Sequence, residues 1–69
     1  MRHFDYESMA RAARMPPAKL ARLRALVRRE FRKDDIMMFE LHMFRVCTAV
    51  RNRRLTIDEA LADEDEAAA

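Results

Sequence analysis

The sequence of 69 residues contains no glycine, no tryptophan, two prolines and a single cysteine. The absence of glycine excludes a glycine-rich loop of the kind that binds a nucleotide phosphate. One cysteine excludes an intramolecular disulfide, and no cysteines and histidines are paired at the spacing of a structural zinc site. A lone cysteine in an apolar run is typical of a reducing compartment. A domain of this size must therefore be stabilised by efficient helix packing or by oligomerisation.

Long apolar runs and strand-forming residues are also scarce. The most apolar stretch, residues 36–50, is interrupted by Glu40, His42 and Arg45, and it is too short to span a bilayer. The first residues lack the apolar segment of a secretory signal peptide. The chain has four phenylalanines, one tyrosine and few β-branched residues, so strands are poorly supported. We expect an all-α protein of the cytoplasm with no membrane partner.

Alanine, leucine, methionine, arginine and glutamate dominate the sequence; these good helix formers favour four helices. The first helix covers about residues 5–14, with Asp5 as its N-cap, and Pro16 disfavours helical geometry at its end. Pro17 suits the first turn of a second helix, which continues to about residue 33. The apolar residues of this second helix share one side, at Leu20, Leu23, Leu26, Val27 and Phe31.

Cap signals also define the second half of the chain. Asp34 or Asp35 N-caps a third helix, because an acid favours the positive end of the helix dipole. Thr56, with Glu59 three residues later, has the capping-box pattern and opens a short fourth helix through about residue 61. We expect the chain to fray beyond residue 62. The predicted architecture is a small four-helix domain at 1–62, followed by an acidic, alanine-ended tail at 63–69.

The third helix carries two apolar stripes. One consists of Phe39, Met43, Val46 and Val50, flanked by Ile36 and Cys47. The other lies well round the helix, at Met37, Leu41 and Phe44. A surface helix of a small domain needs only one apolar face, so we expect the third helix to be central, with another chain covering one stripe. This pattern predicts a homodimer or an obligate heteromer, whose adaptable partner interface contains Met37, Met38, Leu41 and Phe44.

Charge is strongly segregated along the chain. Residues 11–33 contain nine basic residues and one acid, Glu30, whereas residues 58–66 contain six acids and no basic residue. This asymmetry is typical either of a polyanion-binding face with a separate acidic tail or of a solvated face that keeps a small domain soluble. Because the acidic tail is distant in sequence, we expect it to leave the basic face free.

Catalysis has little support in the sequence. No nucleophile motif is present, and His42 and Cys47 are five residues apart, which places them about 140° from each other around a helix. We therefore expect His42 to be a helix-flank or interface residue and Cys47 to be a small core residue. The neighbouring acids at 34–35 and 63–66 are explained as a cap and a solvated tail. The sequence predicts no enzyme activity, no cofactor and no metal.

Residues 6–23 resemble the helix-turn-helix of bacterial transcription regulators. In that family an apolar residue followed by alanine lies in the first helix, matched by Met9 and Ala10. A second small residue precedes the turn, matched by Ala13, and an apolar residue lies in the turn, matched by Met15. Apolar anchors follow in the recognition helix, matched by Leu20 and Leu23. Two helices joined by a tight turn need small residues where they cross, which is the physical reason for the pattern.

The resemblance implies that the second helix enters the major groove of DNA. Ala18, Lys19 and Arg22 would then lie nearest the bases. The residues that would contact phosphates are Arg14, Arg28 and Arg29. The favoured hypothesis is a small DNA-binding regulator that dimerises through its third helix. The alternative is a protein-interaction adaptor whose third helix docks on a partner, and RNA binding is a further alternative.

Overall fold

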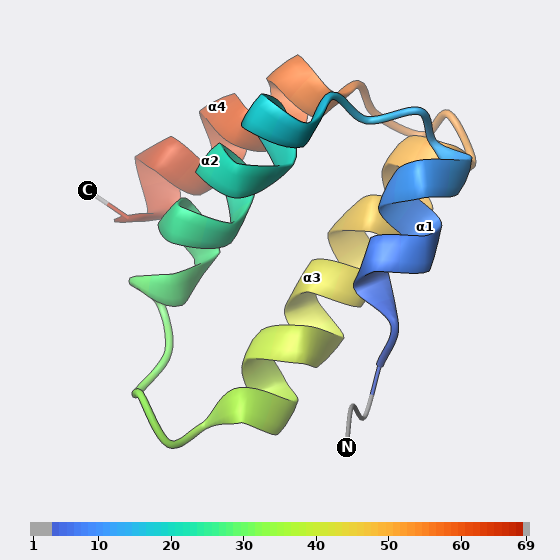
Figure 1. Ribbon diagram of the computed structural model, residues 1–69. Coiled ribbons are helices and arrows are strands. Elements are labelled where there is room, and N and C mark those ends of the chain that lie inside the picture. Colours follow the sequence, from blue (N-terminus) through green and yellow to red (C-terminus); the bar gives the residue numbers. More distant parts are fainter. Residues whose placement is uncertain (1–3, 69) are drawn as a thin grey trace.

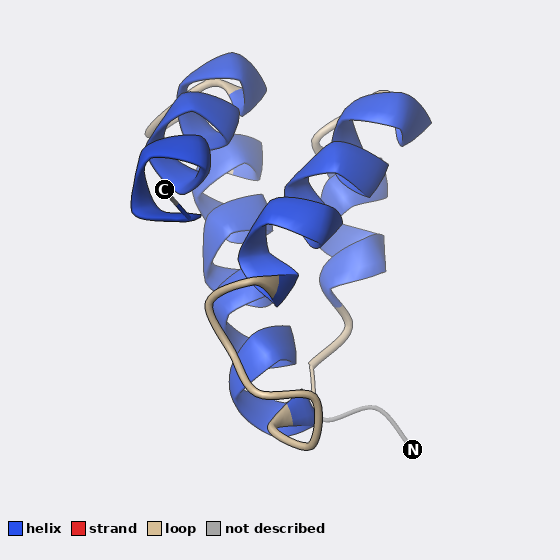
Figure 2. Ribbon diagram, turned by 90° about the vertical axis from the view of Figure 1, so that its left-hand side faces the viewer, coloured by secondary structure: helices blue, strands red, loops and turns tan. Residues whose placement is uncertain are grey.

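The computed structural model describes residues 4–68, and within them every regular element is a helix (Figures 1 and 2). The helices are α1 (Tyr6–Ala12), α2 (Pro17–Arg28), α3 (Ile36–Arg51) and α4 (Ile57–Ala68). The predicted all-α architecture of four helices is therefore confirmed for the described part of the chain. None of the described helices combines the length and apolar composition needed to cross a bilayer.

Two of the predicted caps form the expected hydrogen bonds. The Asp5 carboxylate accepts a hydrogen bond from the backbone N–H of Ser8 at 3.2 Å, which fixes the start of α1. At α4, the N–H of Thr56 donates to the Glu59 carboxylate at 2.8 Å, and the N–H of Glu59 donates to the Thr56 hydroxyl at 3.1 Å. This reciprocal pair is a capping box, as the sequence predicts. Asp35 occupies the N-cap position of α3 without a side-chain capping bond.

Two helix ends differ from the expected boundaries. α2 ends at Arg28, about five residues early, and its last turn is closed by short-range bonds such as Glu30 N–H to the Val27 carbonyl at 2.9 Å. α4 does not fray after residue 62 but continues to Ala68. Glu64, expected in a solvated tail, is only 7% exposed. This tertiary burial, together with the helix-forming alanines and glutamates, extends α4.

The helices pack as two pairs, with α1 along α3 and α2 along α4 (Figure 1). The core between the pairs contains four fully buried side chains, those of Leu23, Val27, Met43 and Cys47. Ala10 of α1 is 1% exposed and belongs to the same core cluster. Its small side chain thus lies in the core of the domain, and α1 has α3, not α2, as its main packing partner.

The two stripes of α3 have different surroundings. Phe39, Met43 and Cys47 of the first stripe are buried, as expected, but Ile36 at its flank is 51% exposed. In the second stripe, the Phe44 ring packs on the core and lies 5.8 Å from the Phe4 ring, so the same chain covers it. Met37 remains 52% exposed. Part of the cover that we expected from another chain is therefore supplied by the segment before α1.

Arginines occupy left-handed backbone positions after α1 and α3. Arg14 has φ 57° and Arg53 has φ 59°. At each position the N–H of the arginine and the N–H of the following residue bond back into the helix. The second of these bonds runs from Met15 N–H to the Ala10 carbonyl at 3.0 Å and from Arg54 N–H to the Ala49 carbonyl at 2.9 Å. These are Schellman turns, in which glycine is the usual residue. The chain, which has no glycine, ends two helices with arginine instead.

Candidate functional site

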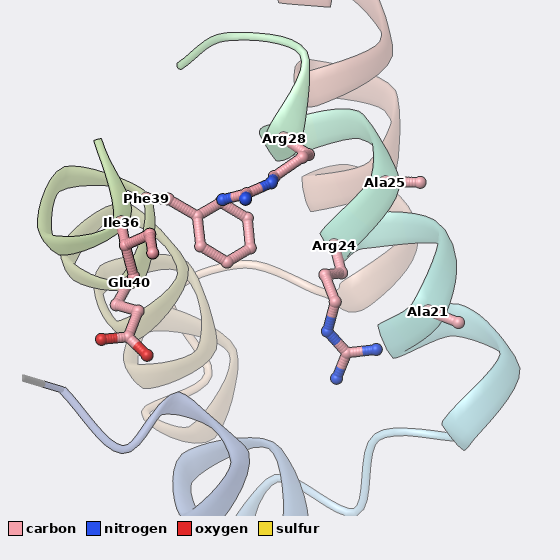
Figure 3. Close-up of a pocket in the computed structure, with 7 residues that line it drawn as sticks. All are labelled: Ala21, Arg24, Ala25, Arg28, Ile36, Phe39 and Glu40. Atoms are coloured by element: carbon pink, nitrogen blue, oxygen red, sulfur yellow. The ribbon is translucent and has the colours of Figure 1, made fainter. Parts of the chain in front are cut away.

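A groove of about 500 Å³ lies between α2 and α3 (Figure 3). This volume is within the range of about 300–1,000 Å³ that is usual for ligand-binding pockets. One wall is part of α2 and the other is the first turn and a half of α3. We refer to it as the α2–α3 groove, and its lining residues are Ala21, Arg24, Ala25, Arg28, Ile36, Phe39 and Glu40.

Aromatic rings hold the two arginines of the α2–α3 groove. The Arg28 guanidinium lies over the Phe39 ring, 4.8 Å from its centroid (Figure 3). The Arg24 guanidinium lies 5.7 Å from the centroid of Tyr6, and its Nε donates a hydrogen bond to the Tyr6 hydroxyl at 3.0 Å. Cation–π contact orders the long side chains and leaves their positive charge beside the groove. The groove therefore combines a mainly apolar lining with two positioned cations and the largely buried carboxylate of Glu40.

Further apolar residues of the first turn of α3 are exposed outside the groove lining. Ile36 lines the groove, and the next two residues, Met37 and Met38, are 52% and 43% exposed. Leu41, also predicted at a partner interface, is half-buried, and Phe44 packs on the core. Of the predicted interface residues, Met37 and Met38 thus lie open to solvent. Met37 is about 100° round the helix from the groove residue Ile36, whereas Met38 is about 200° away and faces away from the groove.

The predicted DNA-contacting residues are mostly exposed, with one exception. Lys19 donates from Nζ to an Asp58 carboxylate oxygen at 2.7 Å, which links α2 to α4. The other five residues have exposed side chains, namely Arg14, Ala18, Arg22, Arg28 and Arg29. The expectation that the acidic segment leaves the basic face free is therefore wrong for Lys19. Packing of α4 on α2 brings acids next to basic residues that are distant in sequence.

A second hollow, of about 420 Å³, lies where α1 and α3 end. It is lined by Ala12, Ala13, Arg14, Val50, Arg51 and Arg53. α1 and α3 run in the same direction (Figure 1), so the negative ends of both helix dipoles meet here. Arginine side chains are favourable at such helix ends. The structure thus brings Arg14 together with two arginines that the sequence had not grouped with it.

Glu30, His42 and Glu64 form a cluster that the sequence analysis missed. Each residue offers one atom that could ligate a metal ion, and these three atoms lie within 4.8 Å of one another. Nε2 of His42 is 2.5 Å from a Glu64 carboxylate oxygen. A hydrogen bond with Glu64, desolvation and the Glu64 charge raise the pKa of Glu30 to about 7. Burial acts to raise the pKa of Glu64, but hydrogen bonds with Glu30 and His42 outweigh it and lower this pKa.

One signal in the sequence points to the buried position of Glu64. Glu64 is three residues after Leu61 and seven after Ile57, which places all three on one face of α4. An acid on the apolar face of a helix needs a partner when it is buried. No local pattern identifies that partner, because Glu30, His42 and Glu64 come from three segments that meet only in the folded chain.

Cys47 is a core residue, as the sequence predicts. Its side chain is 0% exposed, and burial raises the pKa of its thiol to about 11, although the charge of Arg24 acts in the opposite direction. The thiol is therefore protonated and enclosed at neutral pH, whereas a reactive cysteine is an accessible thiolate.

Comparison of the chain with protein-family models, with curated proteins and with solved structures found no match.

Proposed function

We propose that this chain is a non-catalytic protein-interaction subunit whose α2–α3 groove binds an acidic amphipathic helix of a partner protein. The observation that carries the proposal is the combination of an apolar lining that includes the exposed Ile36, a rim with Arg24 and Arg28, and the adjoining exposed Met37. An amphipathic helix lays its apolar face into such a groove. Its flanking acids would then meet the two guanidinium groups.

Charge favours an acidic partner over a second copy of this chain. A symmetric pair of grooves would place Arg24 and Arg28 of one copy against the same arginines of the other, and like charges at an interface oppose association. A guanidinium binds a carboxylate through two parallel hydrogen bonds, so a glutamate on the partner helix has a geometrically suited acceptor. Met37, which follows Ile36 at the edge of the groove, has the flexible side chain that adapts to a partner surface.

Binding of a synthetic amphipathic peptide tests this proposal. The peptide has leucines along one face and glutamates beside them, and binding is measured by fluorescence anisotropy. Ile36→Glu, which places a charge in the groove lining, should weaken binding at least about tenfold, because burying an unpaired charge is costly. Met38→Glu is the matched control: the same substitution at an exposed residue outside the groove lining should leave affinity within about twofold.

Two results would contradict the proposal. The first is a peptide with glutamine in place of glutamate that binds as tightly as the acidic one. The second is a Met38→Glu variant that loses affinity while Ile36→Glu retains it. That second outcome would place the interface where the sequence predicts it, at Met37, Met38, Leu41 and Phe44.

The second candidate function is DNA binding by α2, as the helix-turn-helix resemblance implies. The observation that favours it is the outward face of α2, where the exposed side chains include Ala18, Arg22 and Arg29. The small alanine permits close approach to base edges, and the arginines provide donors. Arg14, in the hollow with two further arginines, precedes α2 in the chain and would contact a phosphate in this hypothesis.

A titration of duplex DNA at low salt distinguishes the two candidate functions. DNA binding predicts an affinity that falls steeply with salt and weakens for all sequences in Arg29→Ala, because Arg29 is a phosphate contact in this hypothesis. Arg22→Ala should instead reduce discrimination between sequences. Ile36→Glu should affect peptide binding far more than DNA binding. Absence of duplex binding at micromolar protein would eliminate this second function.

A further inference from the structure

We infer that Glu30, His42 and Glu64 form a binding site for a divalent first-row transition-metal ion such as Zn²⁺. The three residues come from the turn after α2, from α3 and from α4. Each offers one donor atom, and all three donor atoms lie within 4.8 Å of one another. The imidazole nitrogen and two carboxylate oxygens form a ligand set that zinc accepts.

The observed spacing is close to that of a bound zinc site. Zinc lies about 2.0–2.2 Å from nitrogen and oxygen ligands, so two ligands on one ion are roughly 3–3.5 Å apart in a tetrahedral arrangement. The His42 and Glu64 atoms are hydrogen-bonded at 2.5 Å and would move apart by roughly 0.5–1 Å to take an ion between them, and all three ligand atoms lie within 4.8 Å of one another. Small rotations of side chains, principally of the exposed Glu30, suffice to close the set.

The electrostatics of the cluster favour a cation. Two carboxylates lie close together, and the one on Glu64 is only 7% exposed. The raised pKa of Glu30, about 7, follows mainly from its hydrogen bond with Glu64, which requires a proton between the two groups. A divalent ion placed there removes the repulsion and replaces that proton. Because the ligands must be deprotonated, metal binding should release protons and weaken as pH falls.

The residues of the cluster and those around it determine which class of metal ion would bind and leave that ion accessible to water. The Phe31 ring lies 5.6 Å from the His42 ring and forms an apolar wall on one side. A nitrogen ligand favours zinc and its neighbours over magnesium and calcium, which prefer all-oxygen sites. Three protein ligands leave a fourth position for water on the side of the exposed Glu30.

A metal at this cluster would join the two helix pairs of the domain. His42 belongs to α3 of one pair, whereas Glu64 belongs to α4 of the other and Glu30 follows α2 (Figure 1). The chain has one cysteine and forms no intramolecular disulfide. A coordinated ion would therefore act as the cross-link that small domains often need, and stability would depend on metal supply.

Isothermal titration of the full, untagged chain with ZnCl₂ at about pH 7.5 tests the inference. We expect binding of one ion per chain and a rise in Tm that grows with zinc concentration. Glu64→Gln keeps the shape and the hydrogen-bonding capacity of the side chain but removes a charged ligand. It should weaken zinc binding at least about tenfold, since even the loss of a group that only hydrogen-bonds to a metal ligand lowers metal affinity about 10–100-fold.

Two matched controls remove other candidate ligands. Glu66→Gln makes the same substitution at an exposed residue of the same helix, and His3→Ala removes the only other histidine of the chain. Both should retain zinc affinity within about twofold. Circular dichroism without zinc verifies that each variant is folded. If Glu64→Gln does not fold, Co²⁺ added to the unmodified chain provides the readout, because its visible spectrum reports nitrogen and oxygen coordination.

The inference is overturned by any of three results. These are no binding of zinc at millimolar concentration, equal affinity of the unmodified chain and a folded Glu64→Gln variant, or an affinity that is lost in His3→Ala and kept in His42→Ala. In the first case the cluster binds a proton only, and its role is limited to the pH dependence of stability.

Discussion

Replacing Arg14 or Arg53 with glycine should stabilise the protein. Both arginines hold a left-handed backbone, with φ of 57° and 59°. This conformation costs a residue with a Cβ about 1–2 kcal/mol because Cβ approaches the next carbonyl oxygen, and it costs glycine nothing. The chain bears this cost twice within one small domain, at the turns that end α1 and α3.

The expected gain is smaller than the strain that is relieved. Glycine loses more backbone freedom on folding, which subtracts about 0.5–1 kcal/mol at each site. The net stabilisation is therefore about 0.5–1 kcal/mol per substitution. For a domain of this length, each kcal/mol shifts Tm by about 4–8 °C, so each glycine should raise Tm by roughly 2–8 °C.

Thermal unfolding followed by circular dichroism measures this gain, and alanine variants isolate its cause. Arg14→Ala and Arg53→Ala remove the guanidinium but keep the strained Cβ, so the difference between glycine and alanine reports the backbone alone. Arg51→Gly is the opposite control, because this residue lies in the last turn of α3, where glycine should cost about 1 kcal/mol. If glycine is no more stabilising than alanine at positions 14 and 53, the strain argument is refuted.

Further substitutions test the core, the surface and the acidic cluster. Leu23→Ala, at a side chain that is 0% exposed, should lower the free energy of unfolding by about 2–5 kcal/mol in urea, and a loss below about 1 kcal/mol would contradict its core position. Asp58→Asn breaks the exposed ion pair with Lys19 and should cost less than about 1 kcal/mol. The pKa of Glu30 rises from 4.5 to about 7, so its contribution to stability is present below pH 4.5 and is lost as pH rises through about 7. The free energy of unfolding, measured in urea, should therefore fall less for Glu30→Gln than for the unmodified chain between about pH 5 and pH 8. If this free energy changes equally with pH in the two proteins, the raised pKa of Glu30 is refuted. A thiol reagent should modify Cys47 only after denaturant is added, and rapid native modification would show that the site opens.

The sequence alone determined the helical class, most of the starts of the helices and much of the core. Good helix formers, Pro17, and the caps at Asp5 and Thr56 act through neighbours a few residues away, so their effect is visible in the linear pattern. Apolar spacing likewise identified Leu23 and Met43 as core residues, since both are fully buried.

The tertiary structure alone decided how these helices meet. It paired α1 with α3 and α2 with α4, opened the groove beside Phe39, and brought Glu64 against His42. It also extended α4 past the boundary expected from composition, because burial of Glu64 stabilises a segment that would fray in isolation. These features depend on contacts between residues far apart in the chain, which helix propensity and periodicity do not encode.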